Sequence, residues 1–224
     1  MAQTRFYLPS SGAAAVSPAF DAEWENTAAT DRLKCVTTRI NSTNSFKSTT
    51  DATATAFRDT LLRQYVSDPI ALGIISGTIK GQIRSSAASG AAAGVRAQLI
   101  AKVVSNDGST VRGVLYAGDL DTSATANPTS EFSQAADTNR TFPRGGPVAI
   151  SPVVALDTDR VVLELGYRKH VNVTTGNVSL SFMDNNASDL PEDETTTTAL
   201  NPWIEFSIDL FTPRVRGARS YILD

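Results

Sequence analysis

The chain has 224 residues, of which 41% are hydrophobic and 19% are charged, a composition typical of a globular protein rather than a disordered one. Its net charge of −3 lacks the basic surplus with which nucleic-acid-binding domains neutralise phosphates, and no run of about 18 apolar residues occurs, so we expect neither a nucleic-acid nor a membrane partner. The length fits one large all-β domain or two small ones, with a core that needs no disulfide or metal.

Residues 1–30 differ in pattern from the rest of the chain. A Pro/Ser/Gly/Ala stretch covers residues 9–18, and large apolar side chains stand on either side of it at Phe6, Phe20 and Trp24. This pattern is typical of an extended arm with apolar anchors and not of a core element. The arm folds back on its own domain or docks on a neighbouring subunit, and the sequence leaves both arrangements open. The first residues lack the basic and apolar regions of a secretory signal, so we expect folding in the cytoplasm of the cell that makes the protein.

From Leu33 onward, apolar and polar residues alternate with the period of two that marks a half-buried strand. The clearest run is Ile75–Arg84, whose apolar side carries Gly77 and Gly81. We expect a large side chain from a facing sheet, or a bulge, at these glycines. Residues 95–117 form a predicted β-hairpin around an Asn/Asp/Gly turn. Further predicted strands cover residues 33–37, 61–66, 153–156, 161–167, 178–182 and 203–208.

These short strands, about nine or ten in all, come with almost no helical period. They predict an antiparallel β-sandwich, jelly-roll-like in its long crossovers, as a single domain over residues 31–212. Residues 118–147 are polar and contain several prolines and glycines. We expect them to form a long surface excursion that carries function or covers a sheet edge. Residues 213–224 leave the strand pattern and form a tail.

Few residues and motifs of the sequence are typical of a catalytic site. His170 is the only histidine, so clusters of histidine ligands are excluded and a Ser-His-Asp triad would depend on that one residue. Cys35, the only cysteine, lies in an alternating run, and we interpret it as a small buried hydrophobe rather than a reactive thiol. The chain contains no nucleophile elbow, phosphate-binding loop or zinc-protease motif. We therefore expect no enzyme activity and no cofactor.

The segment 184–194 holds five acidic residues and no basic one. Carboxylates in a loop of a β-sandwich can coordinate Ca²⁺, but the glycine that an EF-hand loop requires is missing. We favour an acidic loop exposed to solvent and no bound metal, with Ca²⁺ as the alternative. The candidate calcium ligands are Asp184, Asp189, Glu192, Asp193 and Glu194.

Two further residues have alternative interpretations. Glu164 shares one side of a predicted strand with Arg160 and Arg168, and a cross-strand ion pair fits it better than one half of a glycosidase carboxylate pair. Trp203 begins the last predicted strand, where it fits a core or sheet-edge position. Stacking on a sugar is the alternative role for Trp203.

The tail at 213–224 is locally basic and ends in the large apolar residues of Tyr-Ile-Leu. We expect it to dock on its own domain or on a neighbour, because an inert tail rarely carries such a group. Its arginines would pair with an acidic rim such as 189–194 of a partner. The candidate assembly residues at the two ends of the chain are Phe6, Phe20, Trp24, Arg214, Arg216, Arg219 and Tyr221.

Several segments taken together resemble virion proteins of tailed phages and prophages. They are Arg5-Phe6-Tyr7-Leu8-Pro9-Ser10, Val16-Ser17-Pro18-Ala19-Phe20, Arg63-Gln64-Tyr65-Val66-Ser67-Asp68-Pro69, Val104-Ser105-Asn106-Asp107-Gly108, Asp189-Leu190-Pro191-Glu192-Asp193-Glu194-Thr195 and Asn201-Pro202-Trp203-Ile204-Glu205-Phe206. The resemblance runs from residue 5 to residue 206 and includes no catalytic motif.

This resemblance implies a non-enzymatic structural protein of a bacteriophage virion, made in the host cytoplasm and built into the particle. A capsid decoration or minor structural subunit fits best. Such a subunit would form homo-oligomers and contact other virion proteins, either major capsid or tail proteins. The alternative is a carbohydrate-binding β-sandwich that adheres to a host or matrix, with a glycan as its ligand. A glycan hydrolase is the third hypothesis.

Overall fold

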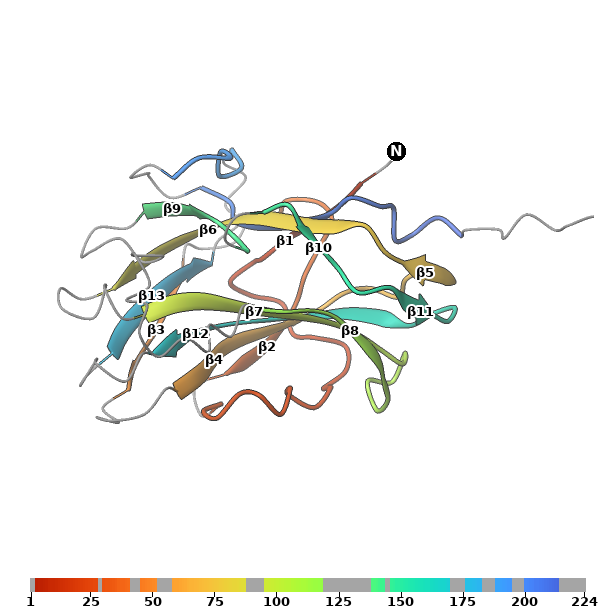
Figure 1. The fold of residues 1–224 in the computed structure, drawn as a ribbon, viewed down its shortest axis with the longest axis horizontal. Helices are drawn as coiled ribbons and strands as arrows, with labels where there is room; N and C mark the ends of the chain where they lie inside the picture. The colour runs from red at the N-terminus through yellow and green to blue at the C-terminus, as the bar shows by residue number, and fades with distance from the viewer. Residues whose placement is uncertain are drawn as a thin grey trace, which may run out of the picture.

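The computed structural model describes residues 3–27, 30–40, 45–51, 58–87, 95–118, 138–143, 146–169, 176–182, 188–194 and 200–213. These residues form two packed β-sheets and a short two-stranded ribbon, which confirms the predicted all-β sandwich (Figure 1). The described ranges contain no helix, and therefore none that could cross a membrane.

The first sheet is seven-stranded and antiparallel, in the order β1-β14-β6-β13-β3 with β9 and β10 also paired to β6. One edge of β6 pairs with β14 and then β13, and its other edge pairs with β10 and then β9. Its strands are β1 (Thr4–Tyr7), β3 (Ser45–Asp51), β6 (Thr78–Ala87), β9 (Thr138–Thr141), β10 (Val148–Ala149), β13 (Gly176–Phe182) and β14 (Trp203–Phe206).

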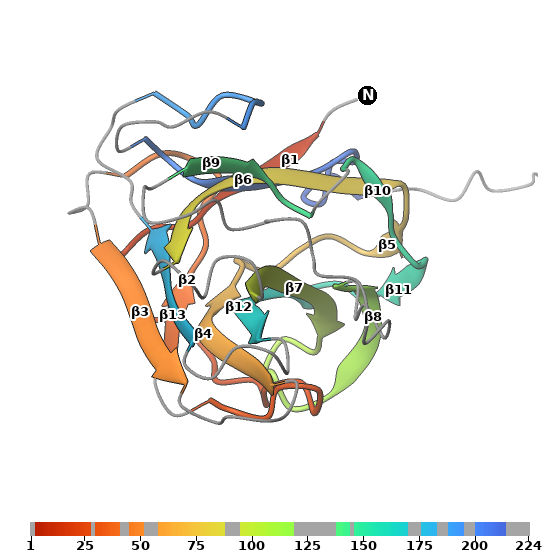
Figure 2. The ribbon, with the colours of Figure 1, turned by 60° about the vertical axis from the view of Figure 1, so that its left-hand side comes forward.

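The second sheet is five-stranded, in the order β2-β4-β12-β7-β8. Its central strand β12 pairs antiparallel with β4 and β7, whereas β2 pairs parallel to β4. Figure 2 shows β13 and β3 running down beside this sheet, where β13 contacts β12 and β3 contacts β4. The strands are β2 (Asp31–Lys34), β4 (Arg58–Val66), β7 (Val95–Val104), β8 (Val111–Ala117) and β12 (Arg160–Lys169).

A two-stranded ribbon of β5 (Gly73–Ile75) and β11 (Val153–Ala155) lies at one end of the sandwich (Figure 1). β5 leads directly into the central strand of the first sheet, and β11 precedes the central strand of the second. The ribbon therefore joins the two layers at this end.

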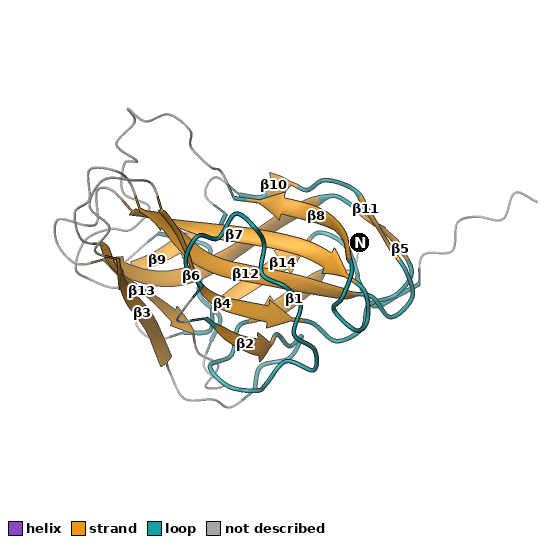
Figure 3. Ribbon diagram, turned by 90° about the horizontal axis from the view of Figure 1, so that it is seen from below, coloured by secondary structure: helices purple, strands orange, loops and turns teal. Residues whose placement is uncertain are grey.

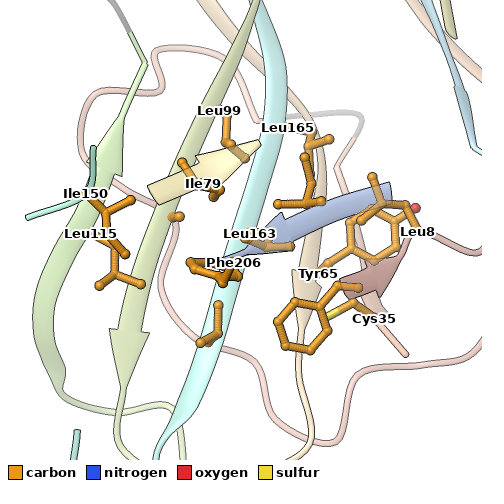
Figure 4. Packing of buried hydrophobic residues seen from close by; sticks show 14 of the residues in the cluster. Leu8, Cys35, Tyr65, Ile79, Leu99, Leu115, Ile150, Leu163, Leu165 and Phe206 are labelled. Carbon is orange, nitrogen blue, oxygen red and sulfur yellow. The ribbon is translucent and has the colours of Figure 1, made fainter. Parts of the chain in front are cut away.

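The core lies between the sheets and is filled by the alternate side chains that the sequence predicted to face inward (Figure 4). Val161, Leu163, Leu165 and Tyr167 of β12 are all fully buried. The predicted hairpin at 95–117 is confirmed as β7 and β8 joined by a turn. Each such apolar side chain adds about 1.5–3 kcal/mol to folding when fully buried. The predicted role of Cys35 as a buried hydrophobe is also confirmed.

The first residues of the chain correct a prediction, because they belong to the sandwich. β1 pairs with β14 as an edge strand of the first sheet. Phe6 and Leu8 are buried in the main core, where the Phe6 ring packs edge-on against Phe206. The sequence suggested an arm outside the core because a single four-residue strand followed by Pro9 carries too little period to identify.

The outer face of the second sheet is covered, although its polar residues suggested exposure to solvent. On β7 and β12, the outward-facing Lys102 and Glu164 are buried together with Ile100 and Val162. The cover is the segment 9–27, which crosses this face before β2 joins the sheet edge. Figure 3 views the sheet from the covered side, with loops in teal. The N-terminal segment therefore folds back on its own domain.

The predicted excursion at 118–147 lies mostly outside the described residues. Its end does not form a loose surface loop. Residues 138–141 form β9 on the edge of β6, and Phe142 is buried in the main core. The predicted close approach at Gly81 comes from the same sheet and not from the facing one. A Cβ on Gly81 would lie 2.6 Å from Ile204 Cδ1 of the neighbouring strand β14.

Candidate functional site

The most buried charged group on the outer face of the second sheet is the carboxylate of Glu164, which is 0% exposed. It accepts a hydrogen bond from the Trp24 indole Nε1 at 2.6 Å and one from Gln64 Nε2 at 2.9 Å. Its charged partner is Lys102 of the adjacent strand, with Nζ 2.9 Å from Oε1. The predicted cross-strand ion pair at Glu164 is thus confirmed, with Lys102 of β7 as its partner.

The same cluster holds the backbone of the covering segment. Lys102 Nζ donates to the carbonyl of Ala19 at 3.0 Å, and Gln64 Nε2 donates to that of Pro18 at 3.3 Å. The backbone N–H of Asp21 donates to Glu164 Oε2 at 3.1 Å. Buried charges are tolerated when such hydrogen bonds replace those lost from water. The arrangement attaches the segment 18–24 to the sheet and leaves the Glu164 carboxylate closed to a substrate.

Gly166 lets the segment approach this closely. It lies at a bulge in the pairing of β12 with β4. A Cβ at this position would lie 2.7 Å from Trp24 Cζ3 and would also collide with the carbonyl of Thr60. The indole therefore rests on backbone that only glycine provides. Beside it, the Arg32 guanidinium stacks on the Phe20 ring, 4.0 Å from its centroid.

The acidic segment predicted at 184–194 is held by basic and polar side chains of the first sheet and nearby loops. Asp189 accepts hydrogen bonds from Arg5 Nη1 at 2.8 Å and from the Tyr7 hydroxyl at 3.1 Å, and Arg39 Nε lies 3.7 Å away. Partial burial and the charge of Asp189 raise the pKa of Tyr7 above its ordinary value. For Arg5, partial burial alone would lower the pKa, but Glu205 and Asp189 outweigh it and raise the pKa.

The remaining acids of the segment each take a separate partner. Glu192 pairs with Lys80 at 2.7 Å, Asp193 accepts from Asn139 Nδ2 at 2.8 Å, and Glu194 pairs with Arg140 at 3.5 Å. The hydrogen bond from Lys80 to Glu192, opposed by partial desolvation and supported by Glu205, raises the pKa of Lys80. No cluster of three or more potential metal ligands occurs among the described residues, and Asp184 lies outside them. Glu192 and Glu194 are exposed as predicted, Asp189 and Asp193 are partly buried, and each of the four already has a partner within the described residues.

Trp203 occupies an interior position, which confirms its prediction as a core residue. The side chain is 1% exposed and its Nε1 donates to the carbonyl of Leu190 at 2.9 Å. The Arg5 guanidinium lies over the ring, 3.9 Å from its centroid. The indole face that a sugar would stack on is therefore covered by this chain's own residues.

A polar cavity of about 190 Å³ opens beside these ion pairs on the outer face of the first sheet. Lys80 and Glu205 stand opposite each other on β6 and β14, and Glu192 closes one side. The other lining residues are Gln3, Thr78, Pro147 and Ser207. Carboxylates, hydroxyls and one ammonium group thus face a shared space that can take a small polar ligand.

The outer face of the β5–β11 ribbon is apolar and exposed. Ile74 and Val154 are direct cross-strand partners, and they are 39% and 58% exposed. Leu72 and Leu156 flank the pair and are 51% and 46% exposed. The inward partners Ile75 and Val153 belong to the main core, so the ribbon presents one apolar face inward and a second one outward.

Three other large hydrophobic residues of the described chain are exposed, and they lie outside this ribbon. Val111 and Val114 of β8 stand opposite Val104 and Lys102 of β7, on the outer face of the second sheet. The Phe211 ring packs edge-on against Phe6 of β1, with 6.2 Å between the ring centroids. We call the outer face of the ribbon the apolar end, made of Leu72, Ile74, Val154 and Leu156.

The structure separates the predicted assembly residues into two groups. Phe6, Phe20 and Trp24 all pack against this chain's own sheets, and Phe6 and Trp24 are buried there. Arg214, Arg216, Arg219 and Tyr221 lie outside the described residues, as does His170. Sequence reasoning missed the apolar end. Its signal was the apolar doublets 74–75 and 153–154, because two adjacent apolar residues in a strand must face opposite sides.

Comparisons with known proteins give no family. The sequence matches no protein-family model and no curated protein. Among solved structures, the chain is similar to a CocE/NonD family hydrolase from Staphylococcus aureus, with 9% sequence identity and a TM-score of 0.30. The alignment covers 92% of this chain and 34% of the hydrolase, so the chain spans about a third of that protein's length. At this TM-score the likeness indicates neither fold nor chemistry for this chain.

Proposed function

We propose that the chain is a non-enzymatic structural subunit of a bacteriophage virion that assembles with copies of itself and with capsid or tail proteins. The observation that supports this proposal is the apolar end, where four exposed large hydrophobic residues lie together on two paired strands and the residues that flank them. Contiguous apolar surface of this kind marks an interaction site, whereas apolar residues scattered singly do not. A capsid decoration or minor structural subunit is the role that we propose.

The rest of the described surface fits a rigid building block. Long-range ion pairs join segments far apart in sequence, as Arg5 does with Asp189 and Glu205, and Arg168 with Asp59. A subunit held rigid by such ion pairs can present one end to a neighbour without changing shape. The entropy cost of association is then low.

The proposal is tested on intact particles. Antibodies against the chain should label purified virions in negative-stain images, at a regular position on the capsid, neck or tail. Mass spectrometry of the same particles should detect the chain in a fixed ratio to the major capsid protein. Particles that lack the chain would overturn the proposal.

A second candidate function is carbohydrate binding, and the polar cavity beside Lys80 is the observation that favours it. Carboxylates and hydroxyls around a space of about 190 Å³ suit the hydroxyl groups of a sugar. A glycan array tests it directly. Glu192→Gln should abolish a true signal from the cavity, while Glu194→Gln, which changes an acid outside the cavity lining, should leave it unchanged. A blank array would remove this candidate.

A further inference from the structure

We propose that the apolar end of one copy binds the segment 214–224 of a second copy. This inference rests on the proposed assembly function and names the partner of the same surface. The docking ribbon is built from the cross-strand pair Ile74 and Val154, with Leu72 and Leu156 on either side. These four side chains are between 39% and 58% exposed.

The segment begins at the rim of the surface. Thr212 lines a small cavity together with Ile74 and Leu210, so the chain leaves the described fold directly beside the ribbon. The sequence then continues for eleven residues, 214–224, which end in Tyr221, Ile222, Leu223 and an aspartate. These three apolar side chains are the kind of group that an apolar ribbon of a partner can bury.

The spacing favours a second copy over the same one. Tyr221 follows Pro213 by eight residues, and an extended chain of that length spans roughly 26 Å. The ribbon, however, is already beside Thr212, so the apolar group would have to reverse direction to reach its own copy. When two copies pair across a two-fold axis with their ribbons set apart by about that length, the segment of each copy reaches the partner's ribbon without turning back. The exchange is then reciprocal and closes after two copies.

Charge favours the same arrangement. Asp157 follows Leu156 directly and is exposed at the rim of the ribbon. The segment carries Arg214, Arg216 and Arg219 between Pro213 and its apolar group. Arginine forks recognise carboxylates in defined geometry, so these side chains can fix the register of the docked segment against that rim. The acidic rim at 189–194 suits them less, because its carboxylates already hold Arg5, Lys80 and Arg140.

The first experiment measures mass in solution by size-exclusion chromatography with light scattering over a concentration series. We expect the full chain to reach twice its monomer mass, and the variant lacking 214–224 to stay monomeric. Ile74→Glu should also remain monomeric, because it places a charge at the centre of the ribbon. Ala22→Glu is the matched control, since it adds the same charge at an exposed position in the turn before Trp24, and it should dimerise like the unaltered chain.

The second experiment tests the contact itself. A fluorescent peptide of residues 213–224 should bind the truncated chain, and Ile74→Glu in that truncated chain should weaken binding about tenfold or more. Circular dichroism and thermal melting of each variant verify that it is folded.

Three outcomes would overturn the inference. One is a truncated chain that self-associates as strongly as the full chain, which would mean that apolar ends pack directly on each other. Another is a peptide that does not bind. The last is a full chain that stays monomeric at every concentration but exchanges amide hydrogens at 72–75 more slowly than the truncated chain. That result would mean that the segment binds the apolar end of its own copy. In all three, labelling of virions could still succeed, so failure of this inference is distinguishable from failure of the proposed function.

Discussion

Trp24 and Glu164 lie 140 residues apart in sequence, yet the indole Nε1 of Trp24 donates a 2.6 Å hydrogen bond to the Glu164 carboxylate in the buried outer face of the second sheet. This contact fixes where the N-terminal segment crosses the sheet. It also explains how a carboxylate can remain in an interior, since Lys102, Gln64 and the backbone N–H of Asp21 supply the other partners.

Breaking this cluster on one side should be costly. Lys102→Met leaves the buried Glu164 without its counter-charge, and we expect the free energy of unfolding to fall by about 3–5 kcal/mol. The double variant Lys102→Met, Glu164→Leu should recover most of the loss, because an apolar pair of similar volume needs no partner. Urea denaturation measures both. Single and double losses that simply add would contradict a coupled buried pair. Lys34→Met, which removes an exposed pair with Asp68, is the control and should cost less than about 1 kcal/mol.

Gly166→Ala should displace the N-terminal segment. Its new methyl group would meet the Trp24 ring and the Thr60 carbonyl, and overpacking of this kind costs about 1–3 kcal/mol. Tryptophan emission should move to longer wavelength as Trp24 becomes wetter, and a protease should cut within 9–27 sooner. Ser151→Ala is the control, because it changes an exposed side chain outside the segment 9–27. A variant with unchanged emission and protease sensitivity would show that the segment is not anchored at Trp24.

The thiol of Cys35 should not react with thiol reagents in the native state. It is buried in the main core, and burial raises its pKa well above the ordinary value of a cysteine. A thiol reagent at pH 8 should label it only as fast as the protein unfolds, and adding denaturant should bring the rate to that of a free cysteine. Fast labelling without denaturant would show that the core opens at this position.

Protonation of Asp107 at low pH should lower the free energy of unfolding. Hydrogen bonds from Ser105 and Ser109 in the turn between β7 and β8 lower its pKa from 3.8 to about 2. Because the unfolded chain binds the proton more tightly, the stabilisation is fully present above about pH 4 and is lost as the pH falls toward 2. Asp107→Asn should flatten this part of the stability curve, measured by thermal melting between pH 2 and 5. An NMR titration that gives the carboxyl an ordinary pKa would contradict the geometry.

The sequence predicted the strands and their inward faces better than it predicted which outer sheet face is buried by another segment. Alternation in 161–167 and 95–117 identifies strands and their inward faces, since a strand repeats every two residues. The same rule assigned Lys102 and Glu164 to solvent. Periodicity cannot reveal that residues 9–27 return to bury them, because that contact depends on tertiary placement and on a glycine at position 166.

The apolar end was missed for a different reason. β5 and β11 are three residues long each, too short for a period to appear, and their outward residues Ile74 and Val154 look like part of longer buried runs. By contrast, Trp203 was placed correctly as a core residue, because an apolar strand position after Asn201-Pro202 leaves few other environments for an indole.

The register of β1 with β14, in which Thr4 stands opposite Phe206, has a consequence for how the protein is made. Ribosomes add about 5–20 residues per second, so β1 waits on the order of ten seconds or more before its partner strand is synthesised. Until then, Phe6 and Leu8 have no sheet to enter, and the last edge of the first sheet stays open. Folding therefore completes only when the earliest and latest segments meet, which makes the nascent chain vulnerable to mispairing for nearly the whole of its synthesis.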